Sequence, residues 1–444
     1  MKTRLLIALL LLLLVAPGPA VARPSVIPLP VRSTSGLRLS ITEGHTALDQ
    51  LQPGTTDLQP QVAPAHAPPG HARIEPSLLR KLLAASDEGM LRAIAMMRVQ
   101  ADPRAVGLAA SDRTARSAVI QDHLQSLAER SQANVRHVLE RARQEGRLHG
   151  YRPFWIINAI AVEAQAEVLW ALAAHPDVSV LLEDRVHYLP DSLPVVSSSS
   201  TGLQWNIARV GADRAWQSLG ITGQGAVVAS LDTGVDWEHP YLRARYRGYS
   251  GKPLVEHDGH WFCATDEDYV YPGDGHGHGT HTTGTMVGES GIGVAPGAQW
   301  IAAKVFDNQG RAYDSWIHAG LEWALAPGGD PALAPDVVNC SWGDLNGANT
   351  RFLADVQALR AAGIVPVFSA GNYGPLEGTI SSPGTFRESI AVGAIDLYDR
   401  VARFSSRGPS PWDEIKPEVS APGVGILSAL PGGGLGEKNG TSMA

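Results

Sequence analysis

The sequence is poor in cysteine. Only Cys263 and Cys340 occur among its 444 residues, too few for a fold held together by disulfides. A hydrophobic core must therefore stabilise the protein. The two thiols could form one disulfide, but the sequence does not give their distance, so a buried free thiol at Cys340 is the favoured interpretation.

The sequence also lacks an excess of positive charge. Its 36 Lys and Arg are outnumbered by 44 Asp and Glu, which gives a formal net charge of −8. This balance argues against a nucleic-acid-binding surface, and we expect no nucleic-acid partner. With 44% hydrophobic and 18% charged residues, 47 Gly and 31 Pro, the composition is typical of a loop-rich globular protein. The length predicts two or three domains.

Long hydrophobic runs are scarce, and the one that stands out is Leu5 to Val15. Lys2 and Arg4 precede it, and Ala20-Val21-Ala22 follows it with the small residues that signal peptidases require. The run is shorter than the roughly 20 residues that span a bilayer. We therefore predict a cleaved signal peptide over residues 1–22, a secreted, extracellular protein, and no membrane anchor in the mature form.

Three further segments are expected before the main domain. Residues 23–76 are rich in Pro, Ala and Gln and predict a flexible leader. Residues 77–188 predict a compact α+β unit, and residues 189–202 predict an exposed linker with a maturation site. The elements expected in the α+β unit are a strand at 94–99, a long helix capped by Ser111 or Asp112 and ended by Gly146 and Gly150, an extended segment at 154–162, a helix at 165–174 and a strand at 178–186.

After Gln204 the pattern changes to short β-branched runs that alternate with helical stretches. The runs AVVASL, WIAAKVF, DVVN and IVPVFSA predict strands. Residues 316–325 and the apolar positions Leu353, Val356 and Leu359 predict helices. This alternation indicates a parallel sheet, whose ligands bind at the carboxyl ends of the strands.

Residues suited to peptide hydrolysis stand at those strand ends. Asp232 follows a strand, His278 lies among small residues that allow close approach of a substrate, and Ser442 follows Gly-Thr in a tight turn. Hydrolysis needs a nucleophile, a base that later protonates the leaving amine, and a carboxylate that orients the base. The order Asp, His, Ser also differs from the order in α/β-hydrolases and in chymotrypsin.

The segments LDTGVDWEHP, HGTHTTGTMVG and NGTSMA resemble the Asp, His and Ser signatures of the subtilisin-like serine peptidases, or subtilases. The resemblance covers essentially residues 204–444 and is most like the bacillopeptidase F branch. It implies an α/β fold, a subtilisin-like three-layer domain with a mostly parallel sheet, preceded by a small α+β (ferredoxin-like) propeptide. The domain expected from the resemblance is residues 203–444.

The resemblance also implies roles for individual residues. Asp232 is the orienting carboxylate, His278 the base and Ser442 the nucleophile, while Asn372 of the SAGN motif donates to the oxyanion. Substrate-binding segments are carried over in the same way: Ser341, Trp342, Gly343, Ser369, Ala370 and Gly371. Asp344 stands where many subtilases have a second glycine, so an acidic wall could alter the pocket beside the scissile bond.

The function implied is that of a secreted serine endopeptidase acting through an acyl-enzyme and made as a self-processed zymogen. Its partners are protein or peptide substrates and its own inhibitory and chaperone propeptide. The chemistry needs no cofactor, although structural calcium is possible. The chain ends two residues after Ser442, where the family continues into a long buried helix, so the chain as given is expected to be inactive.

Two alternatives remain open at this point. His276, His278 and His281 form a His-x-His-x-x-His spacing that also occurs in zinc sites, which would indicate a metallohydrolase. A second alternative is an inactive secreted binding protein with a peptidase fold. A calcium loop at Asp266, Glu267 and Asp268 is also conceivable, but it matches no EF-hand spacing and is better interpreted as an exposed acidic loop.

Overall fold

The computed structural model of the protein describes residues 72–86, 89–106, 112–189, 196–197 and 202–444. The expected signal peptide, Ser111, and most of the expected leader and linker lie outside these residues. All the described residues belong to one compact unit, Pro64–Ala444. We refer to residues 72–189 as the small domain and to residues 202–444 as the large domain. Within the described ranges, no helix has both the length and the apolar character needed to cross a membrane.

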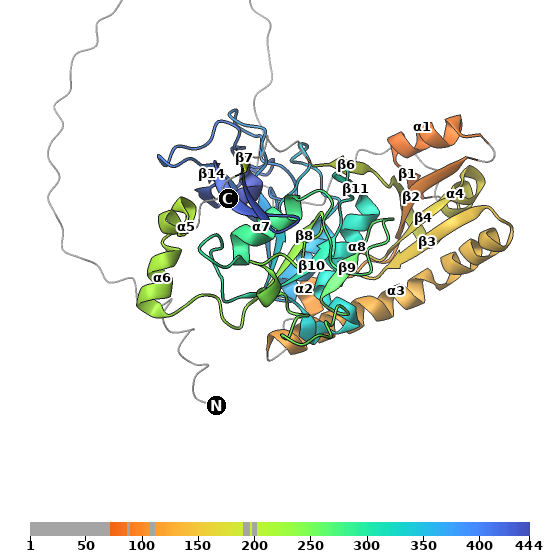
Figure 1. Ribbon diagram of the computed structural model, residues 1–444. Coiled ribbons are helices and arrows are strands. Elements are labelled where there is room, and N and C mark those ends of the chain that lie inside the picture. Colours follow the sequence, from red (N-terminus) through yellow and green to blue (C-terminus); the bar gives the residue numbers. More distant parts are fainter. Residues whose placement is uncertain (1–71, 87–88, 107–111, 190–195, 198–201) are drawn as a thin grey trace, which may run out of the picture. The chain divides into compact units, whose positions relative to one another are not determined.

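The small domain is a sheet covered by helices, and its five strands have the spatial order β1-β5-β2-β4-β3 (Figure 1). All neighbours are antiparallel except β1, which runs parallel to β5. The elements are β1 (Arg73–Ile74), α1 (Pro76–Ala84), β2 (Met90–Met97), α2 (Pro103–Val106), α3 (Arg113–Gln144), β3 (Leu148–Phe154), β4 (Ala159–Gln165), α4 (Ala166–Ala173), β5 (Val178–Glu183) and β6 (Val186–Tyr188).

The long predicted helix is confirmed as α3. Asp112 caps its start, because the side chain accepts a hydrogen bond from the backbone N–H of Ala115 at 2.9 Å. The helix ends at Gln144, and Gly146 follows with a φ of 72° that glycine adopts without strain. Gly150 plays no part in ending it, since this residue lies within β3.

Other boundaries in the small domain also differ from those predicted. The strand expected at 94–99 is β2, which begins at Met90 and ends at Met97. Residues 154–162 are not one extended segment, because a turn at 155–158 separates β3 from β4. The strand predicted at 178–186 ends at Glu183, and β6 pairs instead with a strand of the large domain. The folded part begins before residue 77, because β1, at 73–74, pairs with β5.

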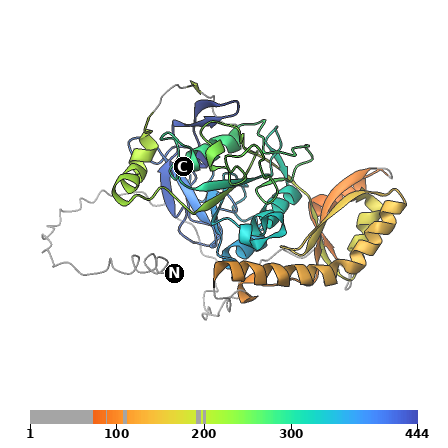
Figure 2. The same ribbon diagram turned by 60° about the horizontal axis from the view of Figure 1, so that its bottom comes forward.

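The sheet of the small domain is buried on both faces. Along β4, Ile160 and Val162 belong to the hydrophobic core of the small domain, whereas Ala159 and Ala161 join a core that continues into the large domain. This alternation follows from the period of two along a strand. One face of the sheet therefore covers its own helices and the other covers the large domain. Figure 2 shows the long helix α3 extending from the large domain to the sheet of the small domain.

The large domain contains the predicted parallel sheet. Its seven strands have the order β15-β14-β13-β12-β8-β10-β9, and all neighbours are parallel. Its strands and α-helices are α5 (Trp205–Val210), α6 (Ala212–Leu219), β8 (Val227–Asp232), β9 (Trp261–Cys263), α7 (His278–Val287), β10 (Gln299–Lys304), β11 (Arg311–Tyr313), α8 (Asp314–Leu325), β12 (Val337–Cys340), α9 (Leu353–Ala361), β13 (Val365–Ser369), β14 (Ile390–Ile395), β15 (Val419–Pro422), β16 (Ile426–Leu430) and β17 (Gly434–Lys438). The short strand β7 (Val196–Ser197) precedes this domain and pairs with β17. Short 3₁₀ turns occur at η2 (Arg243–Arg245), η3 (Pro327–Gly329), η4 (Pro331–Leu333) and η5 (Thr441–Met443).

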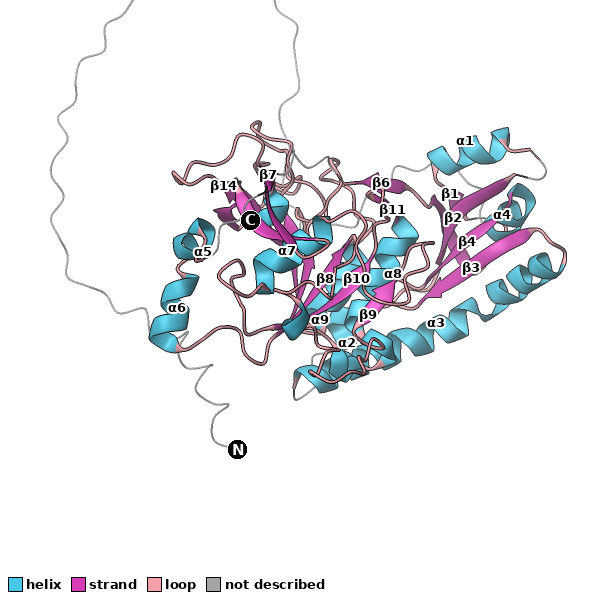
Figure 3. Cartoon of the chain, viewed as in Figure 1, coloured by secondary structure: helices cyan, strands magenta, loops and turns pink. Residues whose placement is uncertain are grey.

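Two hydrophobic cores lie on opposite faces of this sheet, and Figure 3 shows its strands between helices. Along β10, Ile301 and Ala303 face the core that includes α8 and α9, whereas Trp300 and Ala302 face a separate core that includes Val287 of α7. The domain thus has three layers, as the fold class predicts. The predicted strands correspond to β8, β10, β12 and β13, and the predicted helices to α8 and α9.

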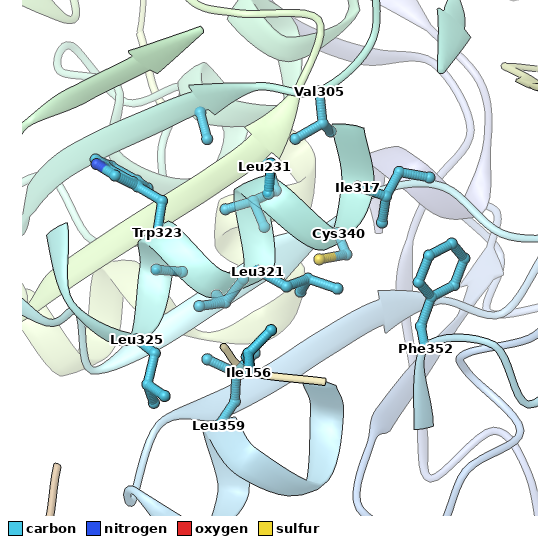
Figure 4. Close-up of a cluster of buried hydrophobic side chains, with 14 of the residues drawn as sticks. Ile156, Leu231, Val305, Ile317, Leu321, Trp323, Leu325, Cys340, Phe352 and Leu359 are labelled. Atoms are coloured by element: carbon cyan, nitrogen blue, oxygen red, sulfur yellow. The ribbon is translucent and has the colours of Figure 1, made fainter. Parts of the chain in front are cut away.

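The core that includes α8 and α9 joins the two domains. Ile156 of the small domain lies among side chains of the large domain, next to Leu321 and Leu359 in Figure 4. The same figure shows the sulfur of Cys340 within the cluster. Both cysteines are free thiols, and Cys340 is fully buried as predicted.

Candidate active site

Asp232 and His278 meet at the carboxyl end of the large sheet. Asp232 is the last residue of β8, and His278 is the first residue of α7. Nδ1 of the imidazole lies 2.7 Å from Oδ1 of the carboxylate. Asp232 is fully buried, and His278 is nearly so. A buried carboxylate in this position fixes the ring orientation and leaves Nε2 as the nitrogen available for proton transfer.

Glycines allow the two elements to come this close. A Cβ atom on Gly279 would overlap the carbonyl oxygen of Gly234, and a Cβ atom on Gly234 would overlap that of Gly273. Gly234 also has a φ of 103°, a conformation that other residues rarely adopt. The predicted need for small residues around His278 is therefore met by direct backbone packing.

Asp274 holds the start of α7, and its role was not predicted. Its two carboxylate oxygens accept five hydrogen bonds, among them those from the backbone N–H groups of Gly277 at 2.7 Å and Thr280 at 2.9 Å. The hydroxyl of Thr233 donates to Asp274 and accepts from Gly279. A carboxylate at a helix N-terminus accepts hydrogen bonds from the unpaired N–H groups there, and its negative charge interacts favourably with the helix dipole. Asp274 thus ties α7 to the end of β8. An acidic residue just before a helix is the only sequence signal for it.

Ser442 lies in the short turn η5, which contacts α7. Its hydroxyl donates to the carbonyl of Ser341 at 2.9 Å, and the Ser341 hydroxyl donates to the carbonyl of Ser442 at 3.1 Å. No hydrogen bond joins Ser442 to His278 in the described part of the chain. To react, the serine hydroxyl would rotate from the Ser341 carbonyl towards Nε2 of His278.

The side-chain nitrogen of Asn372 and the backbone nitrogen of Ser442 lie near the same point, beside Gly440. Oδ1 of Asn372 accepts from the backbone N–H and the hydroxyl of Thr441, both at 2.9 Å. This orients the amide, so that Nδ2 points the other way. A Cβ atom on Gly440 would lie 3.5 Å from Nδ2 of Asn372 and 3.6 Å from the backbone N of Ser442. Two N–H donors near one point could stabilise an oxyanion, and this role of Asn372 stays a prediction.

The segments expected to bind substrate lie beside this turn. Gly371 donates its N–H to the hydroxyl of Thr441 at 3.2 Å, and Ser341 makes the two bonds to Ser442 given above. The side chain of Trp342 is buried, and its Nε1 donates to the carbonyl of Leu231 at 2.8 Å. The side chain of Trp342 therefore packs beneath the site, and its backbone carbonyl accepts a hydrogen bond from the hydroxyl of Ser369 at 3.4 Å. The substrate-binding role of these segments stays a prediction.

Two of the three histidines of the zinc alternative bind other groups. His278 uses Nδ1 for Asp232, and Nε2 of His281 lies 3.1 Å from the carbonyl oxygens of both Ile426 and Gly436. Burial lowers the pKa of His281 to about 3, so its ring is neutral and holds the β16–β17 hairpin on α7. Among the described residues, no three His, Cys, Asp or Glu side chains are grouped as a metal site. The geometry gives no support to a shared zinc.

The acidic loop is used for contacts between and within the domains. Asp266 accepts from Arg92 of the small domain at 3.2 Å, and Glu267 lies 3.1 Å from the buried Nζ of Lys304. Asp268 is exposed. These pairings leave the calcium hypothesis without a ligand cluster in the described part of the chain.

Comparison with known proteins gives one family and several relatives. The model of the Subtilase family matches residues 223–444. Bacillopeptidase F of Bacillus subtilis (strain 168) is 40% identical over 372 residues, which are 78% of this chain and 26% of that protein. Subtilisin E of the same strain is 34% identical over 300 residues, 66% of this chain and 69% of that protein. The alkaline protease of Alkalihalobacillus alcalophilus is 32% identical over 331 residues, 73% and 76% respectively.

The extent of these matches differs. Residues 223–444 are half of the chain, whereas the alignment with bacillopeptidase F covers 78% of it, so that similarity also includes residues before 223. The chain spans only about a quarter of the length of bacillopeptidase F.

Proposed function

The chain belongs to the subtilase family, and from this premise we propose that it is a serine endopeptidase whose reacting residues are Asp232, His278 and Ser442. The single observation that carries the proposal is the buried 2.7 Å contact between His278 and Asp232, at the start of a helix that contacts the turn of Ser442. A histidine oriented in this way can deprotonate a serine hydroxyl at neutral pH.

The proposed reaction has two halves. Ser442 Oγ attacks the carbonyl carbon of the substrate while Nε2 of His278 takes the hydroxyl proton. The oxyanion that forms accepts hydrogen bonds from Nδ2 of Asn372 and the backbone N–H of Ser442. His278 then gives its proton to the leaving amine, and an acyl-enzyme remains. Water attacks this ester with His278 again as the base, which releases the acid and restores Ser442.

Asp232 stays ionised throughout and stabilises the imidazolium. Its other contacts suit this role, because Oδ1 also accepts the backbone N–H of Thr233 at 2.7 Å and Oδ2 lies 3.5 Å from the hydroxyl of Thr282. Asp274 acts one step further away, as a positioning residue that fixes the start of α7.

We also propose that the enzyme is exported and is made as an inactive precursor. We take residues 77–188 as a propeptide that assists folding and inhibits the enzyme, with self-cleavage in residues 189–202 and removal of a signal peptide near Ala22. The contact between β6 and β11 supports this, since the end of the small domain lies as a peptide would lie on the large domain. With a signal peptide of this kind, the protein would be secreted.

The test uses the precursor expressed from the complete gene. We expect a fluorophosphonate probe to label the secreted product, and N-terminal sequencing to find a new terminus within 189–202. Ser442→Ala should abolish both labelling and the new terminus. Ser389→Ala, which removes another buried serine hydroxyl, is the matched control and should keep both.

Other outcomes identify the alternatives. Activity that is lost with a chelator but not with the phosphonate would indicate the metallohydrolase. A folded product that neither reacts with the probe nor cleaves an unfolded protein would indicate a binding protein. Processing of the Ser442→Ala precursor when purified alone would overturn self-cleavage.

A further inference from the structure

The end of the small domain lies on an edge of the large domain as an added strand. In β6, His187 lies opposite Ala312 of β11, and the pair of strands is antiparallel (Figure 1). The next N–H along the chain, that of Leu189, donates to the carbonyl of Gly310 at 2.9 Å. Extended peptides bind sheet edges in this manner, with the backbone giving affinity and alternate side chains giving specificity.

This strand runs towards the proposed active site. A Cβ atom on Gly310 would lie 3.6 Å from Cβ of Leu189 and 3.2 Å from Nε2 of His276. The ring of His276 is in turn 6.3 Å from that of His278, centroid to centroid. A peptide that follows β6 along β11 therefore reaches the residues around His278, so β6 marks the path of a bound substrate.

Only one side chain of β6 faces inward. Val186 and Tyr188 are exposed, whereas His187 is partly buried. Nε2 of His187 lies 2.6 Å from Oδ1 of Asp314, and Nδ1 lies 4.0 Å from Oδ2 of Asp344. The ring of Phe352 is 5.9 Å away. An acidic pocket with one aromatic wall thus receives the side chain at this position.

The pocket has an excess of negative charge that belongs to the large domain. Asp314 is fully buried, and its Oδ2 accepts from Arg351 at 2.8 Å. Burial raises the pKa of Asp314, but His187 and Arg351 outweigh it and hold that pKa below its usual value. The guanidinium of Arg351 also donates to Oε2 of Glu75, in the small domain, at 2.5 Å.

Two carboxylates and one guanidinium remain in the pocket when the small domain leaves. Oδ1 of Asp314 then loses the only donor that it has among the described residues. A buried carboxylate oxygen without a donor is costly, and a charged donor satisfies it best.

We propose that the large domain prefers peptide substrates with a cationic side chain, lysine, arginine or protonated histidine, at the position that His187 occupies. In a substrate, this side chain would lie two residues before the residue that takes the place of Leu189, whose N–H donates to the carbonyl of Gly310. The inference rests on the proposed peptidase function and adds its substrate class.

The first test measures cleavage by the processed enzyme obtained from the full precursor. Internally quenched peptides carry lysine, arginine, norleucine or glutamate at one position at a time. We expect one position at which lysine and arginine give kcat/KM about tenfold above norleucine, the effect of one charge-assisted hydrogen bond. Asp314→Asn should bring this ratio near one. Asp396→Asn, which removes a carboxylate bound to Arg400 at an exposed turn, should keep it.

An enzyme that reacts with the phosphonate but treats lysine and norleucine alike at every position would overturn the inference and leave the proposed function intact. Absence of both labelling and cleavage would overturn the proposed function instead. A second test measures the charge preference of the pocket without catalysis and without altering Asp314.

That test measures amide hydrogen exchange over residues 186–189 in the full chain carrying Ser442→Ala. We expect His187→Lys to keep the protection of this strand, and His187→Leu and His187→Glu to speed exchange about tenfold. Tyr188→Leu, at the exposed neighbouring position, should have no effect. Equal protection with leucine at position 187 would show that the charge of the pocket is not used, and would overturn the inference.

Discussion

Oε2 of Glu322 accepts the backbone N–H of Trp155 at 2.6 Å, so a carboxylate of the large domain binds the start of a turn in the small domain. The neighbouring N–H of Ile156 donates to the same oxygen at 2.9 Å. Burial raises the pKa of Glu322 to about 7, although the two N–H donors act in the opposite direction. The contact therefore depends on pH in the neutral range.

The sign of this dependence follows from proton binding. Between pH 4.5 and about 7 the folded protein holds a proton at Glu322 that the unfolded chain releases. The stabilising contribution is complete below about pH 4.5 and is lost as the pH rises through 7. We predict that Glu322→Gln, measured in the Ser442→Ala precursor by denaturant unfolding, shrinks the loss of stability between pH 5 and pH 8 by roughly 3 kcal/mol. An unchanged pH dependence would contradict this.

The site at Asp274 gives a prediction about stability and activity together. Asp274→Ala removes the acceptor of five hydrogen bonds at the start of α7, and buried N–H groups lose their partner. We expect the free energy of unfolding to fall by about 3 kcal/mol, and kcat to fall with it because His278 begins that helix. Urea unfolding and peptide hydrolysis measure the two effects. Asp268→Ala, in the exposed loop, should change stability by no more than about 0.5 kcal/mol.

Much of the large domain could be predicted because its signals are local. The strands β8, β10, β12 and β13 have continuous apolar runs. In the small domain, the start of α3 could be predicted for the same reason, because Asp112 caps it by a contact three residues away. The proposed catalytic residues were visible for a similar reason, since each stands in a short motif at a strand or helix end. The geometry between Asp232 and His278 then follows from the parallel sheet.

Features that depend on distant partners could not be predicted. The turn at 155–158 reads as extended sequence, and its N–H groups bond to Glu322 on another domain. β6 carries no sign that it leaves its own sheet for β11, and the pairing of His187 with Asp314 joins residues 127 positions apart. Single-sequence patterns hold no information about such pairs.

The cysteines allow a simple chemical test. Cys340 is fully buried and burial raises the pKa of its thiol well above the usual value, whereas Cys263 is partly exposed. We expect a thiol reagent to modify Cys263 in the native precursor and Cys340 only after unfolding. Counting modified thiols by mass spectrometry checks this, with Cys263→Ser as the control that leaves no reactive native thiol. A precursor without any free thiol in denaturant would indicate a disulfide and contradict the structure.

Asn372 offers the most selective test of the proposed chemistry, because its two side-chain atoms have different partners. Oδ1 holds Thr441, while Nδ2 has no acceptor among the described residues and faces the space beside Ser442. Asn372→Asp keeps an oxygen for Thr441 and replaces the amide donor by a carboxylate oxygen that repels an oxyanion.

We therefore expect kcat to fall by about 10²- to 10³-fold or more, the range measured for such donors in subtilisin among others, with KM little changed. The free energy of unfolding should stay within about 1 kcal/mol of the parent, since the Thr441 contacts remain. Steady-state kinetics and urea unfolding of the same preparations separate these effects. If kcat were unchanged, Asn372 would be only a structural acceptor for Thr441. If stability and kcat fell together, the loss of activity would be explained by a displaced Ser442 turn rather than by a missing donor.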